Sequence, residues 1–162
     1  MSRPKETAKI ILEFHKNIII KEEEELVEIS HGSWEGKLES EINQEWGDLL
    51  KTWKEEPDKA QMPGGENIRN VWSRSIEAFE RICSELLENE TALLVAHDAV
   101  NKTILCHLLG LQPADIWKIK QGNGGITIID ITSNPLEPNI VTSLNLTSHL
   151  GDIIDKTAVG AL

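Results

Sequence analysis

Apolar residues recur along the chain at two spacings, one typical of helices and one typical of strands. Intervals of three and four residues predict helices over 5–15, 38–53 and 66–87. Ser40 is expected to cap the second helix, and the third has the longest apolar face. That face comprises Ile68, Val71, Trp72, Ile76, Phe79, Ile82, Cys83 and Leu86.

Shorter apolar runs predict strands between and after these helices. Residues 18–20 and 92–96 each form such a run, and a helix over 99–109 follows the second at once. Alternation over 126–131 and 140–146 predicts a hairpin. Interleaved helices and strands that end in a hairpin predict an α/β fold with a mixed sheet.

Turn-forming residues separate these segments. Two glycines within 26–36 predict an irregular loop, and the Pro-Gly-Gly run at 63–65 predicts a tight turn. A short helix is expected over 113–118, and Asn134-Pro135 marks the turn of the hairpin. Helices on both faces of the sheet make a three-layer α/β/α sandwich, and 162 residues fit a single domain over 1–162.

The charge balance limits the classes of partner. The net charge is −11, from 16 Lys and Arg against 27 Asp and Glu. Nucleic acid and an anionic membrane both require a basic footprint, so neither is an expected partner. A small phosphorylated metabolite remains compatible, because a site can be locally positive. With no secretory leader and no apolar run of about 20 residues, a cytoplasmic location is expected.

Five side chains of the predicted helices are expected to be buried. Cys83 and Cys106 fall on apolar helix faces, which indicates reduced thiols rather than a disulfide. Trp46, Trp53 and Trp72 also occur at helical spacing and are expected in the core.

Residues 91–110 hold the clearest functional signal. Their apolar run ends at His97, and a helix begins directly after it. In open α/β sheets, ligands collect at the carboxyl ends of the strands, and a helix N-terminus offers free N–H groups and a partial positive charge. His97 is therefore predicted to contact an anion such as phosphate, against the alternative of a structural histidine.

The His-Asp pair at 97–98 also suggests a metal-dependent phosphohydrolase. Such a site needs further His and Asp ligands. The remaining histidines, His15, His31, His107 and His149, show no ligand spacing. No metal and no cofactor is expected.

Two charged residues are further candidates. Glu28 precedes a glycine-bearing loop over 32–36, where a carboxyl kept protonated near neutrality can act as a general acid. Its alternative is a surface glutamate beside four others. Arg3 stands at the start of the first helix, and a guanidinium suits bidentate phosphate binding. Its alternative is a disordered side chain near the terminus.

Three other residues carry weaker signals. His31 precedes a glycine, as some catalytic histidines do, but it follows Ser30 rather than arginine and no apolar strand leads to it. It is not expected to be a nucleophile. Asn123, flanked by glycines, either turns the chain or contacts a ligand, and Trp34 is a candidate to pack over a site.

Four motifs occur in a fixed order along the chain. They are S-R-x-x-x-T-A at 2–8, E-x-x-x-G-x-W-E-G at 28–36, P-G-G-E at 63–66 and V-A-H at 95–97. This order resembles the histidine phosphatase superfamily, in its phosphoglycerate-mutase-like branch, over nearly the whole chain. The resemblance implies phosphoryl transfer from a small phosphomonoester through a phosphohistidine, either as a mutase (an isomerase) or as a phosphatase (a hydrolase).

The resemblance assigns roles to three residues. Arg3 matches a phosphate-binding arginine, Glu28 the carboxyl that protonates the leaving oxygen, and His97 a histidine that binds the transferring phosphoryl group. Asn123 is carried as a substrate-binding candidate, and Glu66 matches a motif position without an assigned role.

Two positions depart from the family pattern. Asp98 stands where the family usually has glycine, and we expect it to cap a helix that starts at Ala99. Lys102 lies near a position where the family often has arginine.

The sequence contains no Arg-His-Gly, the family motif whose histidine is the nucleophile. The expectation is an N-terminally truncated domain that is weakly active or inactive alone and is completed as a homodimer or by a missing N-terminal segment. The alternative function is a non-catalytic phosphate-binding or interaction module.

Overall fold

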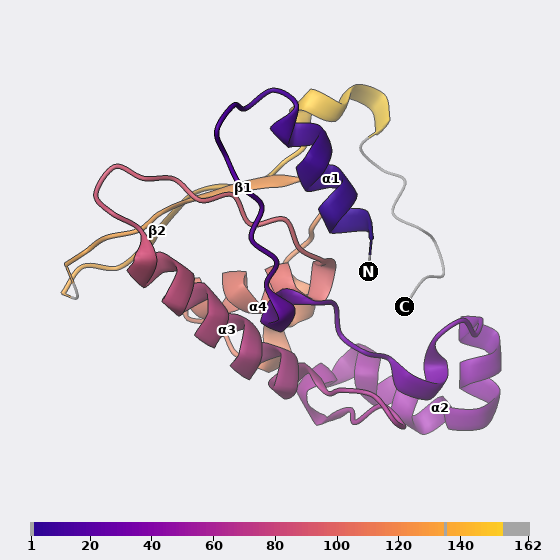
Figure 1. Cartoon of the computed structure of the whole chain (residues 1–162). Coiled ribbons are helices and arrows are strands. Elements are labelled where there is room, and N and C mark those ends of the chain that lie inside the picture. The colour runs from indigo at the N-terminus through magenta and orange to yellow at the C-terminus, as the bar shows by residue number, and fades with distance from the viewer. Residues whose placement is uncertain (1, 135, 154–162) are drawn as a thin grey trace.

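The computed structural model describes residues 2–134 and 136–153 (Figure 1). Pro135 of the expected hairpin turn and residues 154–162 lie outside this described part. The helices and strands, in chain order, are α1 (Arg3–Leu12), α2 (Glu39–Glu55), α3 (Ile68–Glu85), α4 (Asp98–Leu108), β1 (Ile126–Asp130) and β2 (Ile140–Leu146). Short 3₁₀ turns connect them at η1 (Glu24–Leu26), η2 (Gly32–Trp34), η3 (Pro57–Lys59), η4 (Pro113–Lys118) and η5 (Ser148–Ile153).

Helix α3 forms within two residues of its predicted bounds, and its start has a clear local cause. The Asn67 side chain accepts a hydrogen bond from the backbone N–H of Asn70 at 2.9 Å, and the Asn70 side chain accepts one from Asn67 at 3.2 Å. These two bonds satisfy N–H groups that the first turn of a helix leaves free. The helix therefore begins at Ile68.

Helix α2 begins before its expected cap. It starts at Glu39, so the assignment of Ser40 as the cap is wrong. The Glu41 carboxylate instead accepts a hydrogen bond from the Leu38 N–H at 2.7 Å. A charged acceptor one turn into the helix thus satisfies the N–H of Leu38, the residue at the cap position. At Trp46 the backbone leaves helical geometry, with φ −136° and ψ 42°, and kinks α2.

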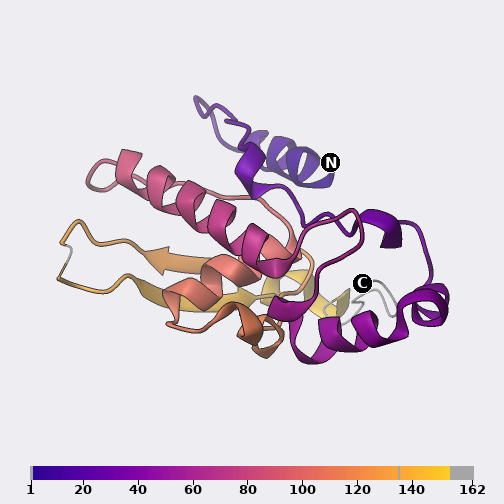
Figure 2. The same ribbon diagram turned by 90° about the horizontal axis from the view of Figure 1, so that it is seen from below.

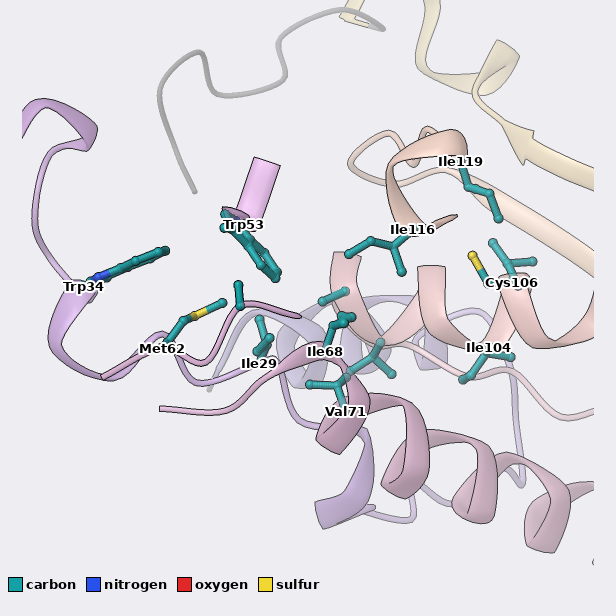
Figure 3. Packing of buried hydrophobic residues seen from close by; sticks show 14 of the residues in the cluster. Ile29, Trp34, Trp53, Met62, Ile68, Val71, Ile104, Cys106, Ile116 and Ile119 are labelled. Carbon is teal, nitrogen blue, oxygen red and sulfur yellow. The ribbon is translucent and has the colours of Figure 1, made fainter. Parts of the chain in front are cut away.

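The core lies between α3, α4 and η4, and α2 closes it at one end (Figure 3). Figure 3 shows Ile68 and Val71 from α3, Ile104 and Cys106 from α4, and Ile116 from η4 gathered in this region. Trp53 of α2 is buried there as predicted. Trp46 and Trp72 are only partly buried, but both pack against this cluster.

One polar contact lies inside the α3–α4 interface. The hydroxyls of Ser75 and Thr103 are 2.8 Å apart, and both residues are fully buried. The Thr103 hydroxyl donates to the Val100 carbonyl at 2.7 Å, so the Ser75 hydroxyl supplies the proton between the two. Two small residues with satisfied hydroxyls let the helices approach closely.

The two cysteines are free. Cys106 is buried, as predicted, whereas Cys83 is only partly buried. Burial raises the pKa of the Cys106 thiol to about 11. It therefore stays protonated at neutral pH, which suits a core residue.

The predicted hairpin is confirmed. Strands β1 and β2 pair antiparallel, with Ile126 opposite Leu146 and Asp130 opposite Ile140. In the view of Figure 2 the pair lies below α3, on the side away from α1. Its side chains alternate between exposed and half-buried, because one face packs against the helices and the other meets solvent.

The strands expected at 18–20 and 92–96 do not form in the described part of the chain. A strand exists only where a neighbour supplies backbone hydrogen bonds, and no described segment pairs with either one. Leu94 and Ala96 are partly buried and pack against the core, whereas Leu93 is exposed. The mixed α/β composition is confirmed, but the described residues contain a two-stranded sheet and not a three-layer sandwich.

No helix within 2–134 or 136–153 has the length and apolar character needed to cross a membrane.

Candidate active site

His97 lies at the start of α4. Its backbone is extended, with φ −112° and ψ 173°, and the helix begins at the next residue. The imidazole is almost enclosed, with 8% of the side chain exposed. The sequence prediction of a histidine at a helix N-terminus is thus confirmed, although no strand leads to it.

The Glu28 carboxylate faces this imidazole. Glu28 Oε2 lies 3.9 Å from His97 Nδ1, and 17% of the Glu28 side chain is exposed. Its other oxygen accepts a hydrogen bond from the Ile29 N–H at 3.0 Å. Residues 69 positions apart in the sequence therefore meet at one site.

Burial sets the protonation of both groups. It raises the pKa of the Glu28 carboxyl, and the nearby negative charge of Asp98 adds to this, although the backbone N–H groups of Ile29 and Ala99 oppose it. Burial also lowers the pKa of His97, and the positive charge of Arg3 acts in the same direction. The pair therefore favours a neutral imidazole beside a carboxyl that holds its proton at higher pH than usual.

Glu28 lies in an irregular loop whose backbone is hydrogen-bonded to the side chains of Glu66 and Arg74. The Glu66 carboxylate accepts hydrogen bonds from Arg74 at 2.9 and 3.1 Å and from the Ser30 N–H at 2.9 Å. Arg74 also donates to the backbone carbonyls of Glu25 at 2.6 Å and Glu28 at 3.4 Å. Sequence reasoning gave Glu66 no role and missed Arg74. Arg74 lies outside the apolar face of α3 that the sequence predicts, so its residue type alone did not distinguish it from Arg69 and Arg81 of the same helix.

Two glycines let this loop approach the Pro-Gly-Gly turn. Gly32 has φ +55°, and a Cβ there would overlap the backbone of Pro63, Gly64 and Gly65. A Cβ on Gly65 would likewise overlap the carbonyl of Ser30. The two segments are therefore in direct backbone contact, which hydrogen bonds from Ser33 to Pro63 and from Glu66 to Ser30, both 2.8 Å, confirm.

His31 lies in the same loop and close to the site. Burial lowers the pKa of its imidazole, and the charges of Glu28 and Glu35 oppose that effect. Its Nδ1 is buried and has no hydrogen-bond partner in the described structure, while its ring meets Trp53 edge-on at 5.9 Å between centroids. Trp34 is buried in the core rather than placed over the site.

The two remaining candidates are exposed side chains. Arg3 is exposed in the first turn of α1, and its charge is felt at His97. Asn123 is exposed in a turn closed by a hydrogen bond from Gly125 to Gly122 at 2.9 Å. The turn is confirmed, and among the described hydrogen bonds none joins Asn123 to Glu28 or His97.

Asp98 does not cap α4, so that expectation is wrong. The helix begins at Asp98 itself, and His97 occupies the cap position. The Asp98 carboxylate instead accepts a hydrogen bond from Lys102 at 2.8 Å, one turn further along. The Lys102 ammonium also lies 4.9 Å from the centre of the Trp117 ring. Both partners explain how this lysine is tolerated in a largely buried position.

Within the described ranges, no group of three or more His, Cys, Asp or Glu side chains is arranged to hold a metal ion.

Comparison with known proteins identifies relatives across most of the chain. The model of the histidine phosphatase superfamily (branch 1) matches residues 1–142. Phosphoserine phosphatase 1 of Hydrogenobacter thermophilus is 29% identical over 137 residues, which cover 85% of this chain and 63% of that protein. The 2-carboxy-D-arabinitol-1-phosphatase of Triticum aestivum is 30% identical over 135 residues, covering 83% of this chain and 27% of that protein.

Solved structures show a similar fold. The Bacillus stearothermophilus protein YhfR superposes with a TM-score of 0.83 at 29% identity, covering 91% of this chain and 71% of that one. A mycobacterial glucosyl-3-phosphoglycerate phosphatase, solved with inorganic phosphate, superposes with a TM-score of 0.77 at 21% identity. The match covers 90% of this chain and 73% of that one. The chain spans less than two thirds of the length of the Hydrogenobacter and Triticum phosphatases.

Proposed function

Because the chain belongs to the histidine phosphatase superfamily (branch 1), we propose that Glu28 and His97 form the acid and phosphate-binding part of a phosphoryl-transfer site. The substrate class is a small phosphomonoester. The observation that carries the proposal is the 3.9 Å approach of a buried carboxyl to a buried imidazole at a helix N-terminus.

His97 and the start of α4 are proposed to bind the phosphoryl group. Free N–H groups and the partial positive charge at a helix N-terminus attract an anion. The lowered pKa of His97 favours a neutral imidazole, which donates one N–H without forming an ion pair with Glu28. Arg3 is proposed to supply the positive charge that a neutral imidazole does not, which supports binding of a dianionic phosphate.

Glu28 is proposed to act as the general acid. When the bond between phosphorus and the ester oxygen breaks, that oxygen needs a proton to leave as an alcohol. The raised pKa of Glu28 keeps such a proton available at a higher pH than an exposed glutamate would. The new bond to phosphorus comes from a nucleophile, which the family resemblance implies is a histidine. The sequence contains no Arg-His-Gly to assign as that group.

Phosphomonoesterase activity of the 162-residue chain toward a small aryl phosphate tests this proposal. We expect slow turnover that falls by about tenfold or more in His97→Ala, because a hydrogen bond to a charged group contributes about 1.5–3 kcal/mol. His15→Ala, which changes an exposed histidine, is the matched control and is expected to retain the activity. Equal activity in the His97 variant and the wild type would contradict the proposed role.

A non-catalytic phosphate-binding module is the second candidate, favoured by the sequence's lack of Arg-His-Gly. It predicts that inorganic phosphate binds, and that His97→Ala weakens this binding, without any turnover. Calorimetric titration with phosphate separates the two candidates from each other. Absence of both binding and turnover would contradict both.

A further inference from the structure

The Glu28 carboxyl is placed by a loop that has little regular structure of its own. After the single turn η1 ends at Leu26, residues 27–31 form neither helix nor strand. A carboxyl in such a loop keeps a fixed position only where other parts of the fold hold the backbone on either side of it.

Arg74 holds the loop on the N-terminal side of Glu28 and at Glu28 itself. Its guanidinium donates to the carbonyl of Glu25 at 2.6 Å and to the carbonyl of Glu28 at 3.4 Å. Only 14% of the Arg74 side chain is exposed. Because Arg74 belongs to α3, an 18-residue helix that packs against α4, these bonds tie the loop to the core of the fold.

Glu66 holds the loop on the C-terminal side. Its carboxylate accepts from the Ser30 N–H at 2.9 Å, and its own N–H donates to the Ser30 carbonyl at 2.8 Å. The same carboxylate is paired with Arg74 through both of its oxygens. The two side chains thus form one unit that contacts the loop before, at and after Glu28.

We infer that Glu66 and Arg74 are positioning residues, which fix the loop so that the Glu28 carboxyl faces His97. Neither side chain contacts the candidate phosphate position at the start of α4 in any hydrogen bond of the described structure. Their effect on Glu28 passes through the backbone of residues 25–30. This inference rests on the proposed function for its catalytic meaning, whereas the geometry of the unit is independent of it.

The charges around each group define what a test must resolve. Besides His97, the charged or titratable side chains that act on Glu28 are Asp98 and His31. Burial opposes the charged form of Glu66, but the hydrogen bonds from Arg74 and Ser30 outweigh it and lower the pKa of Glu66. Glu66 therefore stays ionised, and the unit stays closed, well below neutral pH.

Carboxyl-carbon NMR titration of Glu28 in Arg74→Gln and Glu66→Gln tests the inference. Released from the unit, the Glu28 carboxyl gains solvent, so its pKa is expected to fall toward the ordinary value for glutamate. Arg69→Gln is the matched control: it removes another arginine of α3 that pairs with an acidic side chain, Asp58, away from this loop. A Glu28 pKa that is the same in folded Arg74→Gln, Glu66→Gln and wild type would overturn the inference.

Turnover gives a second reading that keeps the two proposals apart. If the aryl phosphate is hydrolysed, Arg74→Gln and Glu66→Gln are expected to lower kcat at least tenfold, with KM within about twofold, because the acid is misplaced and the phosphate contacts remain. A raised KM with unchanged kcat would overturn the positioning role. If wild type shows neither turnover nor phosphate binding, the proposed function fails, and the NMR titration still decides the positioning role.

Wild-type protein decides the question if the variants do not fold. The Ser30 amide signal is expected to titrate together with the Glu66 carboxyl, and the Glu28 carboxyl signal is expected to show an inflection at that same pH. A Ser30 amide chemical shift that does not change when Glu66 is protonated would overturn the inference.

Discussion

At the scale of single residues, Glu28 and His97 are largely enclosed ionisable groups, and burial disfavours the charged form of each. A buried carboxyl with a raised pKa binds its proton more tightly in the folded chain than in the unfolded one. The protonated Glu28 carboxyl therefore makes its full contribution to the free energy of unfolding at acid pH. This contribution is lost as the pH rises from the ordinary glutamate value of about 4.3 through the higher folded pKa.

Glu28→Gln is accordingly expected to stabilise the chain at pH 7. A neutral amide of the same size avoids the cost of a buried charge, and the expected gain is about 0.5–2 kcal/mol, typical of stabilising substitutions. Thermal unfolding at pH 7 and pH 4 measures it, as a rise of a few degrees in Tm that disappears at pH 4. Glu24→Gln, which changes an exposed glutamate of the preceding turn η1, should show no such gain. A Glu28→Gln variant less stable than wild type at pH 7 would argue against this charge cost.

Sequence reasoning singled out Glu28 and His97 as candidates, but it did not predict the contacts that hold the loop around Glu28. His97 and Glu28 could be predicted because motif order and a helix start mark them in the sequence. The link from Arg74 to the Glu25 and Glu28 carbonyls could not, because it joins residues 49 and 46 positions apart and depends on how α3 docks. Backbone acceptors leave no trace in residue identity, so only the fold reveals them.

At the scale of elements, helices followed the sequence more closely than strands. The start of α3 depends on Asn67 and Asn70, which are neighbours in the sequence, so a local pattern was enough to predict it. A strand needs a partner from elsewhere in the chain. The hairpin met this need because β1 and β2 are close in sequence, whereas 92–96 found no partner among the described residues.

The α3–α4 contact is expected to depend on its buried hydroxyl pair. Ser75→Ala and Thr103→Val should each lower the free energy of unfolding by about 1 kcal/mol, because each removes the hydrogen-bond partner of the other, buried hydroxyl. The double variant should cost less than the sum of the two, by about 0.5–1 kcal/mol, since one interaction is shared. Urea unfolding of the four proteins measures this coupling, and strict additivity would mean that the two hydroxyls do not interact.

At the scale of the whole molecule, a groove remains beside the core. Its volume is about 750 Å³, and its walls come from the C-terminal half of α3, residues 87–94, α4 and β1. Apolar side chains line much of it, among them Phe79, Ile82, Leu86 and Ile129. Polar side chains such as Asn101 and Gln121 share its walls, and its apolar part offers more contact to an apolar molecule than isolated surface residues do.

An apolar fluorescent dye is expected to bind in this groove. Leu86→Lys places a charge on its wall and should reduce the dye fluorescence several-fold. Leu136→Lys changes a side chain that is 92% exposed and lies outside the groove, so it should leave the fluorescence unchanged. Equal fluorescence of the Leu86 variant and the wild type in a titration would locate the dye elsewhere.

The backbone contact between Gly32 and the Pro-Gly-Gly turn also limits how this chain can change by mutation. Because a Cβ at Gly32 or at Gly65 would meet backbone atoms rather than a movable side chain, a compensating substitution cannot restore the fit. A randomised library of both positions should therefore return glycine at each under selection for folding. The segment that carries Glu28 and Gly32 can therefore change mainly at exposed positions such as Ser33.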